Sequence, residues 1–542
     1  MADRVYLFDT TLRDGAQTQG VDFTVSDKLA IARELDRLGV DYIEGGWPGA
    51  NPTDDAFFAE PPRLERARFT AFGMTRRPGR SAANDPGLQA VLGARAAAFC
   101  LVGKTWDFHV ELALGVSPEE NLQLIRDSVA AAGARGEALF DCEHFFDGYK
   151  ANPAFALACA RAAHEAGARW VVLCDTNGGT LPHEVEAIVA EVARHVPGSN
   201  LGIHAHNDTE NAVANSLAAV RAGARMIQGT LNGLGERCGN ANLCSIIPTL
   251  KLKLGYDIGI DDAGLARLTA VSRMLDDRLN RTPNRYAPYV GPSAFAHKGG
   301  LHVSAVEKEI QRLDDSADGG WLKTYEHVAP YAVGNRRVVV VSDQAGRANI
   351  LSRLRDLRIA IDPKDPRVDR LVEQVKQRDA EGYAYDNAEA SFELMVRRAL
   401  GQLDEHQFFE VPKYRVIEDH RLEGGDQVVT PSDALVRVRV GEDERLSAGE
   451  GRGPVDALDH ALRSALLEFF PGLRGVGLVD YKVRILTPQG GTEAVTRVWI
   501  ESRGADGALW RTVGVSENII EASFQALRDS YNFKLCRDGL AA

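Results

Sequence analysis

The sequence predicts an α/β protein whose N-terminal half folds as a closed (β/α)8 barrel. Residues 1–275 contain eight short apolar, β-branched runs at a spacing of roughly 30 residues, with helical patterns between most of them. The runner-up is an open doubly wound sheet, but the first predicted strand is not followed by a Gly-x-Gly-x-x-Gly turn. The pattern then changes twice, which predicts mostly helical linker subdomains at 276–415 and an α+β domain at 416–542.

The predicted barrel is of the TIM type, and each of its strands corresponds to one apolar run. The eight runs are Val5–Phe8, Tyr42–Glu44, Phe69–Phe72, Ala98–Val102, Ala138–Cys142, Trp170–Cys174, Leu201–Ile203 and Met226–Ile227. Between the first two, the apolar residues of Leu29–Leu38 share one helical face, and Gly39 is a natural helix end. Ser117–Glu120 has the residues of a capping box, with proline at the first helical position.

The two regions after the barrel differ in pattern. The linker contains helical stretches at Val368–Gln377 and Ala388–Leu403. The C-terminal region is rich in strands, interrupted by two helices, which is typical of a separate α+β domain. The predicted strands and helices are Ala434–Val440, Pro454–Phe469 (helix), Tyr481–Leu486, Ala494–Ile500, Trp510–Gly514 and Asn518–Tyr531 (helix).

Composition limits the classes of partner. The chain has 542 residues, 44% hydrophobic and 26% charged, and a net charge of −13, which argues against a general nucleic-acid or anionic-membrane binder. No apolar run approaches the roughly 20 residues of a membrane span. The N-terminus leads directly into the first strand without room for a secretion signal, and the seven cysteines are scattered. We therefore predict a cytoplasmic protein with reduced thiols.

Polar residues follow the predicted strands at their C-terminal ends, where TIM barrels carry their catalytic groups. Their convergence on one rim is the main reason to predict an active site there. The candidates are Arg13 and Asp14 after the first strand, Glu44 at the end of the second, Glu143 after the fifth, Thr176 after the sixth, His204 and His206 at the seventh, and Asn240 after the eighth.

Two histidines and one aspartate at this rim predict a metal site. His204 and His206 are two residues apart on a strand, so both point to the same face. With Asp14 they leave open coordination positions for a substrate, and this donor set suits Zn²⁺, Mn²⁺ or Mg²⁺ with added waters. Arg13 beside it can hold a carbonyl oxygen or a developing alkoxide, although an ion pair with Asp14 is the alternative. The combination indicates carbonyl chemistry on a 2-oxo acid.

The remaining candidates each have a functional and a structural interpretation. Glu143 lies near aromatic residues, and an apolar setting would raise its pKa and make it a proton carrier; otherwise it is a rim carboxylate bonded to backbone. Thr176 either binds a substrate carboxylate or caps its strand. Asn240 either reaches the metal or braces the glycine-rich loop before it. His302 lies outside the predicted barrel, and its sequence position alone is typical of a surface histidine.

These motifs carry a family resemblance. The segments Phe8–Gly15, Ile203–Asp208 and Asn232–Asn240 resemble those of the DRE-TIM metallolyase family, whose Asp-Arg-Glu set is carried here by Asp14, Arg13 and Glu44. Within that family the chain is similar, over nearly its whole length, to the group of isopropylmalate, homocitrate and citramalate synthases.

Further segments refine the resemblance. Gly451–Ala457 and Gly514–Ser523 look like the leucine- or isoleucine-sensing domain of these synthases, and Tyr42–Pro52 looks most like the citramalate branch. Isopropylmalate synthases typically read Arg-Asp-Gly-Glu-Gln after the first strand. Here Ala16 stands in place of that glutamate, which distinguishes the chain from them.

The resemblance implies roles for particular residues. Metal ligands would be Asp14, His204 and His206, with Asn240 nearby. Arg13 would contact the keto oxygen, and Thr176 would contact the carboxylate of the 2-oxo acid. Glu143 and His302 would transfer protons. Tyr325 would help from the linker, where one subunit of a homodimer would complete its neighbour's site.

The resemblance also implies an activity: the metal-dependent condensation of acetyl-CoA with pyruvate and water to give citramalate and CoA, in isoleucine biosynthesis. A branched-chain amino acid, isoleucine or leucine, would act as inhibitor at the C-terminal domain. Two alternatives stay open at this point. One is a 2-isopropylmalate or homocitrate synthase, and the other is a non-catalytic amino-acid sensor with an inactive barrel.

Overall fold

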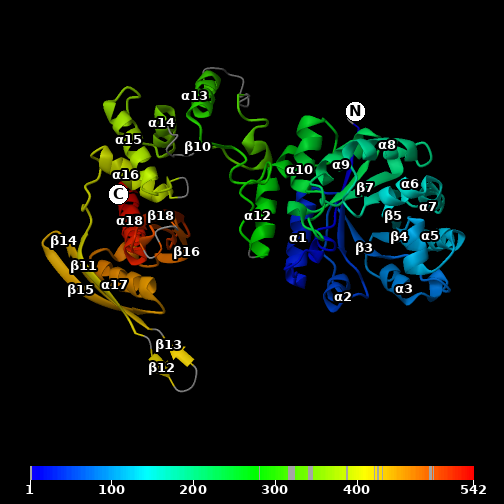
Figure 1. Ribbon diagram of the computed structural model, residues 1–542, viewed down its shortest axis with the longest axis horizontal. Helices are drawn as coiled ribbons and strands as arrows, with labels where there is room; N and C mark the ends of the chain where they lie inside the picture. Colours follow the sequence, from blue (N-terminus) through cyan, green and yellow to red (C-terminus); the bar gives the residue numbers. More distant parts are fainter. Residues whose placement is uncertain are drawn as a thin grey trace. The chain divides into compact units, whose positions relative to one another are not determined.

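The computed structural model describes residues 3–279, 281–314, 324–339, 346–385, 388–419, 421–423, 427–429, 431–487, 491 and 493–541. The chain divides into two compact units (Figure 1). The first comprises Met1–Phe295 together with Glu326–Arg337, and the second comprises Ala296–Tyr325 together with Val338–Ala542. The predicted domain boundaries after 275 and 415 stay predictions.

The first unit is a closed barrel of eight parallel strands in sequential order, in which β1 pairs with both β2 and β8. Its strands are β1 (Tyr6–Asp9), β2 (Tyr42–Gly46), β3 (Arg68–Met74), β4 (Ala98–Lys104), β5 (Glu137–Glu143), β6 (Trp170–Asp175), β7 (Leu201–Ala205) and β8 (Met226–Gly229). Every predicted run therefore forms a strand, and the predicted fold class is confirmed.

Helices surround this barrel and begin and end where the sequence signals them. Thr24 caps the first helix in a capping box with Asp27, and Gly39 ends it in the left-handed conformation at φ 103°. The helices are α1 (Val25–Leu38), α2 (Pro52–Ala59), α3 (Pro86–Leu92), α4 (Asp107–His109), α5 (Pro118–Gly133), α6 (Phe145–Ala151), α7 (Pro153–Glu165), α8 (Pro182–Val192), α9 (Ala212–Arg221), α10 (Leu243–Pro248), α11 (Asp262–Leu265) and α12 (Leu268–Arg278).

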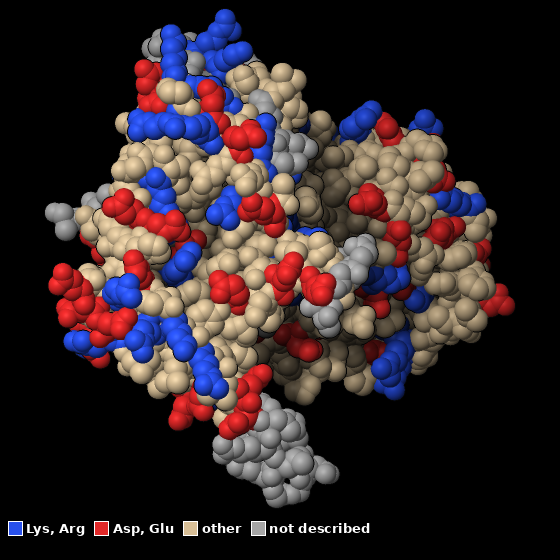
Figure 2. All heavy atoms as spheres, turned by 60° about the vertical axis from the view of Figure 1, so that its left-hand side comes forward, with Lys and Arg blue, Asp and Glu red and all other residues tan. Residues whose placement is uncertain are grey.

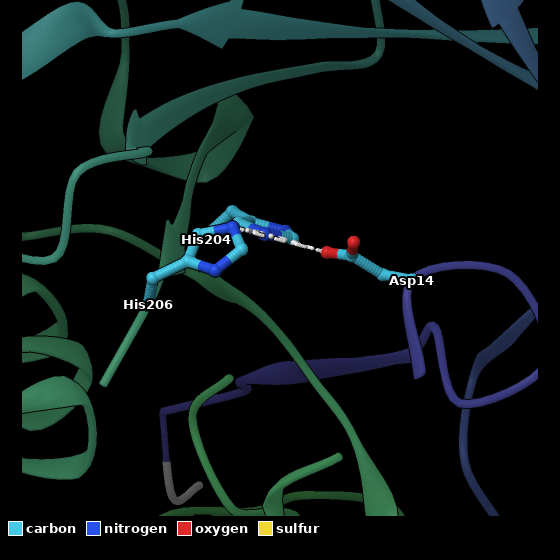
Figure 3. Close-up of side chains that lie close together, drawn as sticks. All are labelled: Asp14, His204 and His206. Atoms are coloured by element: carbon cyan, nitrogen blue, oxygen red, sulfur yellow. Dashed lines mark hydrogen bonds and ion pairs between the residues drawn. The ribbon is translucent and has the colours of Figure 1, made fainter. Parts of the chain in front are cut away.

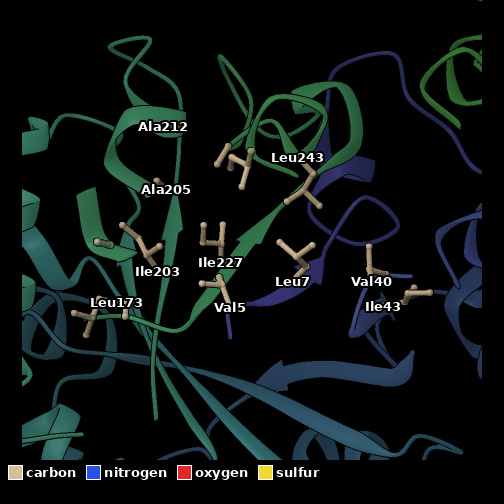
Figure 4. Close-up of a cluster of buried hydrophobic side chains, with 14 of the residues drawn as sticks. Val5, Leu7, Val40, Ile43, Leu173, Ile203, Ala205, Ala212, Ile227 and Leu243 are labelled. Carbon is tan, nitrogen blue, oxygen red and sulfur yellow. The ribbon is translucent and has the colours of Figure 1, made fainter. Parts of the chain in front are cut away.

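The core of the first unit lies mainly between the strands and these helices. Figure 4 shows Leu7, Ile203 and Ile227 pointing from their strands into this apolar cluster, with Leu243 of α10 nearby. All four are fully buried, and each such side chain contributes about 1.5–3 kcal/mol by leaving water. Parallel strands buried on both faces explain why the runs are continuously apolar rather than alternating.

The second unit combines helices with antiparallel sheets. One sheet has the strand order β11-β14-β15 and another β16-β17-β18, and α17 and α18 pack on them. The elements are β9 (Ala296–His297), α13 (Gly300–Asp314), β10 (Val338–Val339), α14 (Arg347–Asp356), α15 (Pro366–Ala380), α16 (Glu389–Ala399), β11 (Glu410–Glu418), β12 (Arg421–Glu423), β13 (Gln427–Val429), β14 (Ser432–Val440), β15 (Asp443–Gly451), α17 (Pro454–Phe469), β16 (Gly477–Ile485), β17 (Thr496–Arg503), β18 (Leu509–Ser516) and α18 (Ile519–Ala541).

The surface carries charges of both signs (Figure 2), and most of the cysteines lie inside the protein. On the face drawn in Figure 2, acidic and basic side chains are interspersed. Six of the seven cysteines are buried, and Cys238 is exposed. Within the described part of the chain, no helix is both long and apolar enough to cross a membrane.

Candidate active site

The predicted metal ligands converge at the C-terminal rim of the barrel (Figure 3). Asp14 lies in the turn after β1, His204 is on β7, and His206 follows β7 directly. His204 Nε2 is 3.1 Å from Asp14 Oδ2 and 3.3 Å from His206 Nε2. His206 Nε2 is 4.0 Å from Asp14 Oδ2. Three donor atoms from distant parts of the sequence therefore face one point, as the sequence predicts.

The chemistry of these donors fits a divalent cation. Among the described residues, Asp14, His204 and His206 form a group whose potential ligand atoms lie within 4.8 Å of one another, and all three are buried. Asn240 lies beside them because its backbone bridges to that of His206, and its Nδ2 donates to Asp14 Oδ2 at 2.7 Å. The same Nδ2 is 3.4 Å from His204 Nε2, so the amide nitrogen of Asn240 faces the ligand atoms, and its Oδ1 is buried without a hydrogen-bond partner.

The charges at this point stabilise an anionic aspartate and affect the two imidazoles differently. Burial opposes the charged form of His204, but the hydrogen bond and the charge of Asp14 outweigh it and raise the pKa of His204. Burial disfavours the charged form of Asp14, but Arg13, His204 and His206 outweigh it and lower the pKa of this carboxyl. Burial, helped by the nearby charge of His204, lowers the pKa of His206 to about 3. At neutral pH His206 is therefore uncharged, which is the form that binds metals.

Arg13 is held rigidly beside the three ligands. Its Nε donates to Glu44 Oε2 at 2.7 Å, and its Nη1 lies 3.2 Å from Asp14 Oδ1. The guanidinium carbon is 3.9 Å from the centre of the Phe72 ring, a cation–π contact. Thr10 Oγ1 also donates to Glu44 Oε2, at 2.5 Å. The two interpretations of Arg13 are thus compatible, because it pairs with Asp14 and still lies next to the candidate metal position.

Two other rim residues, Glu143 and Thr176, have partners that the sequence does not predict. Glu143 forms an ion pair with Lys104, its cross-strand neighbour on β4, so the expected apolar setting is wrong. The cause is strand register, which brings this lysine opposite Glu143. Thr176 Oγ1 accepts a hydrogen bond from the backbone N–H of His144 at 2.9 Å, and its predicted contact with a substrate carboxylate stays a prediction.

His302 and Tyr325 both belong to the second unit. Their rings stack on each other, with centroids 3.9 Å apart and planes 15° from parallel, and both side chains are exposed. Their predicted catalytic roles stay predictions.

Sequence reasoning missed a polar pair inside the barrel. Gln228 on β8 contacts His204 Nδ1 through its Oε1 at 2.7 Å, and its Nε2 donates to Asp141 Oδ1 on β5 at 2.9 Å. A signal was present, since each residue is a polar interruption within or at the end of an apolar strand run.

Comparisons with known proteins cover nearly the whole chain. The HMGL-like family matches residues 4–274, the homocitrate synthase post-HMGL domain-like family residues 289–382, and the LeuA allosteric (dimerisation) domain residues 386–535. A protein of Aquifex aeolicus named (R)-citramalate synthase is 49% identical over 99% of both chains. The chain belongs to the (R)-citramalate synthase family.

Further relatives agree with this membership. (R)-citramalate synthases of Geobacter sulfurreducens and a Synechocystis strain are 49% and 48% identical, over 98% and 99% of this chain and 97% of their own. Among solved structures, an HMG-CoA lyase of Bacillus subtilis covers 52% of this chain and 96% of its own, at 20% identity and a TM-score of 0.45. As a member of the (R)-citramalate synthase family, the chain is an enzyme.

Proposed function

We propose that the chain condenses acetyl-CoA with pyruvate and water to give (R)-citramalate and free CoA, with the help of a divalent cation. The observation that carries the proposal is the rim triad with Arg13 beside it, in a chain 43–49% identical to five proteins named (R)-citramalate synthase. A protein named probable 2-isopropylmalate synthase is 34% identical, which favours pyruvate over the larger 2-oxo acid. The buried, converging ligand atoms argue against an inactive barrel.

Asp14, His204 and His206 would hold the cation, with Asn240 beside them and hydrogen-bonded to Asp14. When bound, a divalent metal supplies Lewis-acid polarisation of the ketone of the 2-oxo acid. Two imidazole nitrogens and one carboxylate suit Zn²⁺ and Mn²⁺, and with added waters also Mg²⁺.

Arg13 is proposed to hold the oxygen that becomes an alkoxide. The enolate carbon of acetyl-CoA forms a bond to the ketone carbon of pyruvate, and the ketone oxygen gains negative charge. Arg13 is already fixed by Glu44 and Phe72, so its charge stabilises that oxygen without reorganisation during the reaction. Thr176 would orient the carboxylate of pyruvate. Because its Oγ1 accepts from a backbone N–H, its hydroxyl hydrogen remains to donate.

His302 is proposed to take the proton from the acetyl methyl group, with Tyr325 holding its ring by stacking. Glu143, with its charge paired to Lys104, is the second candidate for proton transfer. After the carbon–carbon bond has formed, water adds to the thioester carbonyl and the C–S bond breaks, which releases CoA as the thiol.

We further propose a homodimer regulated by a branched-chain amino acid. The match of residues 386–535 to the LeuA allosteric (dimerisation) domain supports this proposal. Isoleucine is the expected inhibitor, with leucine as the alternative. Allosteric inhibition requires that effector binding and substrate binding share a coupling free energy, typically about 1–3 kcal/mol.

The decisive experiment measures thiol release from acetyl-CoA with pyruvate, 2-oxoisovalerate and 2-oxoglutarate, with and without a chelator. We expect pyruvate to have the highest kcat/KM, chelator to abolish turnover, and added Mn²⁺ or Mg²⁺ to restore it. His204→Ala should behave like the chelated enzyme, whereas His195→Ala, a part-exposed histidine before β7, should keep its activity. A preference for 2-oxoisovalerate or 2-oxoglutarate would overturn the proposal.

A further inference from the structure

A chain of polar side chains continues from the candidate metal position into the barrel. His204 on β7, Gln228 on β8 and Asp141 on β5 leave at most 5% of their surface exposed. Much of their surroundings is apolar, since Cys100 and Met226 belong to the buried cluster inside the same barrel. Burying a polar group costs free energy unless it is hydrogen-bonded, so the arrangement of these three side chains is tightly constrained.

The hydrogen bonds among Asp141, Gln228 and His204 have a defined direction. An ionised Asp141 only accepts, so the amide nitrogen of Gln228 faces it, at 2.9 Å from Oδ1. That orientation leaves the amide oxygen of Gln228 facing His204 Nδ1 at 2.7 Å. Because an amide oxygen accepts and does not donate, Nδ1 must carry the hydrogen. The nitrogen that remains to bind a cation is then Nε2, which faces Asp14 and His206.

We propose that Gln228, oriented by Asp141, is a positioning residue that fixes the tautomer and ring plane of His204 for metal binding. The proposal rests on the metal site of the proposed function and adds a residue to it. A histidine that binds a metal through one nitrogen usually donates its other N–H to a carboxylate, a carbonyl or water. In this barrel a carboxylate on β5 would act through an interposed amide on β8, because Gln228 contacts both Asp141 and His204.

The test is the dissociation constant of Mn²⁺ from the full-length chain, measured by the electron paramagnetic resonance signal of free Mn²⁺. Gln228→Met keeps the length of the side chain but removes the acceptor, and loss of such a partner typically weakens metal binding about 10–100-fold. Gln228→Glu keeps an oxygen facing Nδ1, so its dissociation constant should stay within about threefold of the wild-type value. Met226→Leu, equally buried on the same strand, is the matched packing control and should leave binding unchanged.

Melting temperatures of all variants establish that they are folded. If Gln228→Met does not fold, Gln228→Asn replaces it, because this shorter amide cannot contact Asp141 and His204 together and should also weaken binding. A folded Gln228→Met or Gln228→Asn chain with wild-type affinity would overturn the proposal, as would equal losses in the Met and Glu variants, which indicate packing alone. A wild-type chain that binds no Mn²⁺ would instead overturn the metal site itself.

Discussion

Arg13→Lys tests whether the geometry of the guanidinium, and not only its charge, stabilises the reaction. Arg13 contacts Glu44 through Nε at 2.7 Å, lies 3.2 Å from Asp14 through Nη1, and stacks on Phe72. A lysine keeps the charge, but it has one nitrogen and no planar face. It cannot pair with Glu44 and still face the ketone oxygen. Removing a preorganised oxyanion donor costs about 2.7–4 kcal/mol, which corresponds to a loss of about 10²–10³ in kcat.

The assay is thiol release from acetyl-CoA with saturating pyruvate and Mn²⁺. Arg76→Lys is the matched control, because Arg76 is also buried but pairs with Asp127 on α5. We expect the kcat of this control to stay within about threefold of wild type, because the ion-pair partners of Arg76, Asp127 and Glu120, are not residues of the candidate site. An Arg13→Lys enzyme that retains more than about a tenth of the wild-type kcat would refute the proposed role of Arg13.

Three other predictions concern pH, proton transfer and regulation. Burial raises the pKa of Asp9 to about 7 against the hydrogen bonds from Thr11, so the folded state binds this proton more tightly than the unfolded state. The stabilisation that protonated Asp9 provides is therefore fully present below about pH 4. It is lost as the pH rises from there through about 7, which lowers the free energy of unfolding by on the order of 4 kcal/mol. Asp9→Asn should flatten the fall of Tm between about pH 4 and pH 7, and a profile parallel to wild type would contradict this account. His302→Ala should lower kcat by about 10²–10⁴ without changing Mn²⁺ affinity, while the exposed His406→Ala should not; near-normal turnover would remove His302 from the mechanism. Isoleucine should raise the Tm of the full chain and lower its turnover, with leucine and valine as comparators, and the absence of any response to all three would exclude this regulation.

The sequence predicts the barrel well because its strands are buried on both faces and read as apolar runs. Trp170–Cys174, for example, becomes β6 (Trp170–Asp175). The same signal fails for β15 (Asp443–Gly451), which pairs only with β14 and is largely exposed. Its charged, glycine-containing sequence lacks the alternation that marks a half-buried strand, so the sequence does not predict this strand.

The candidate site was predictable to the extent that it depends on topology. The C-terminal ends of parallel strands meet at one rim, so His204 and Asp14 could be placed together from the strand order alone. Contacts that depend on register could not be predicted, as Glu143 shows by pairing with Lys104. The apolar runs that predict the barrel strands do not indicate Gln228, although a buried polar residue is the more informative exception.

The most direct test of this account is an anomalous difference map from a crystal of the full-length chain soaked with Mn²⁺. The account predicts one strong peak per chain within bonding distance of Asp14, His204 and His206. Two results would contradict it. One is a map in which these three side chains are well ordered but no peak lies between them, and the other is a peak that is bound by other residues instead.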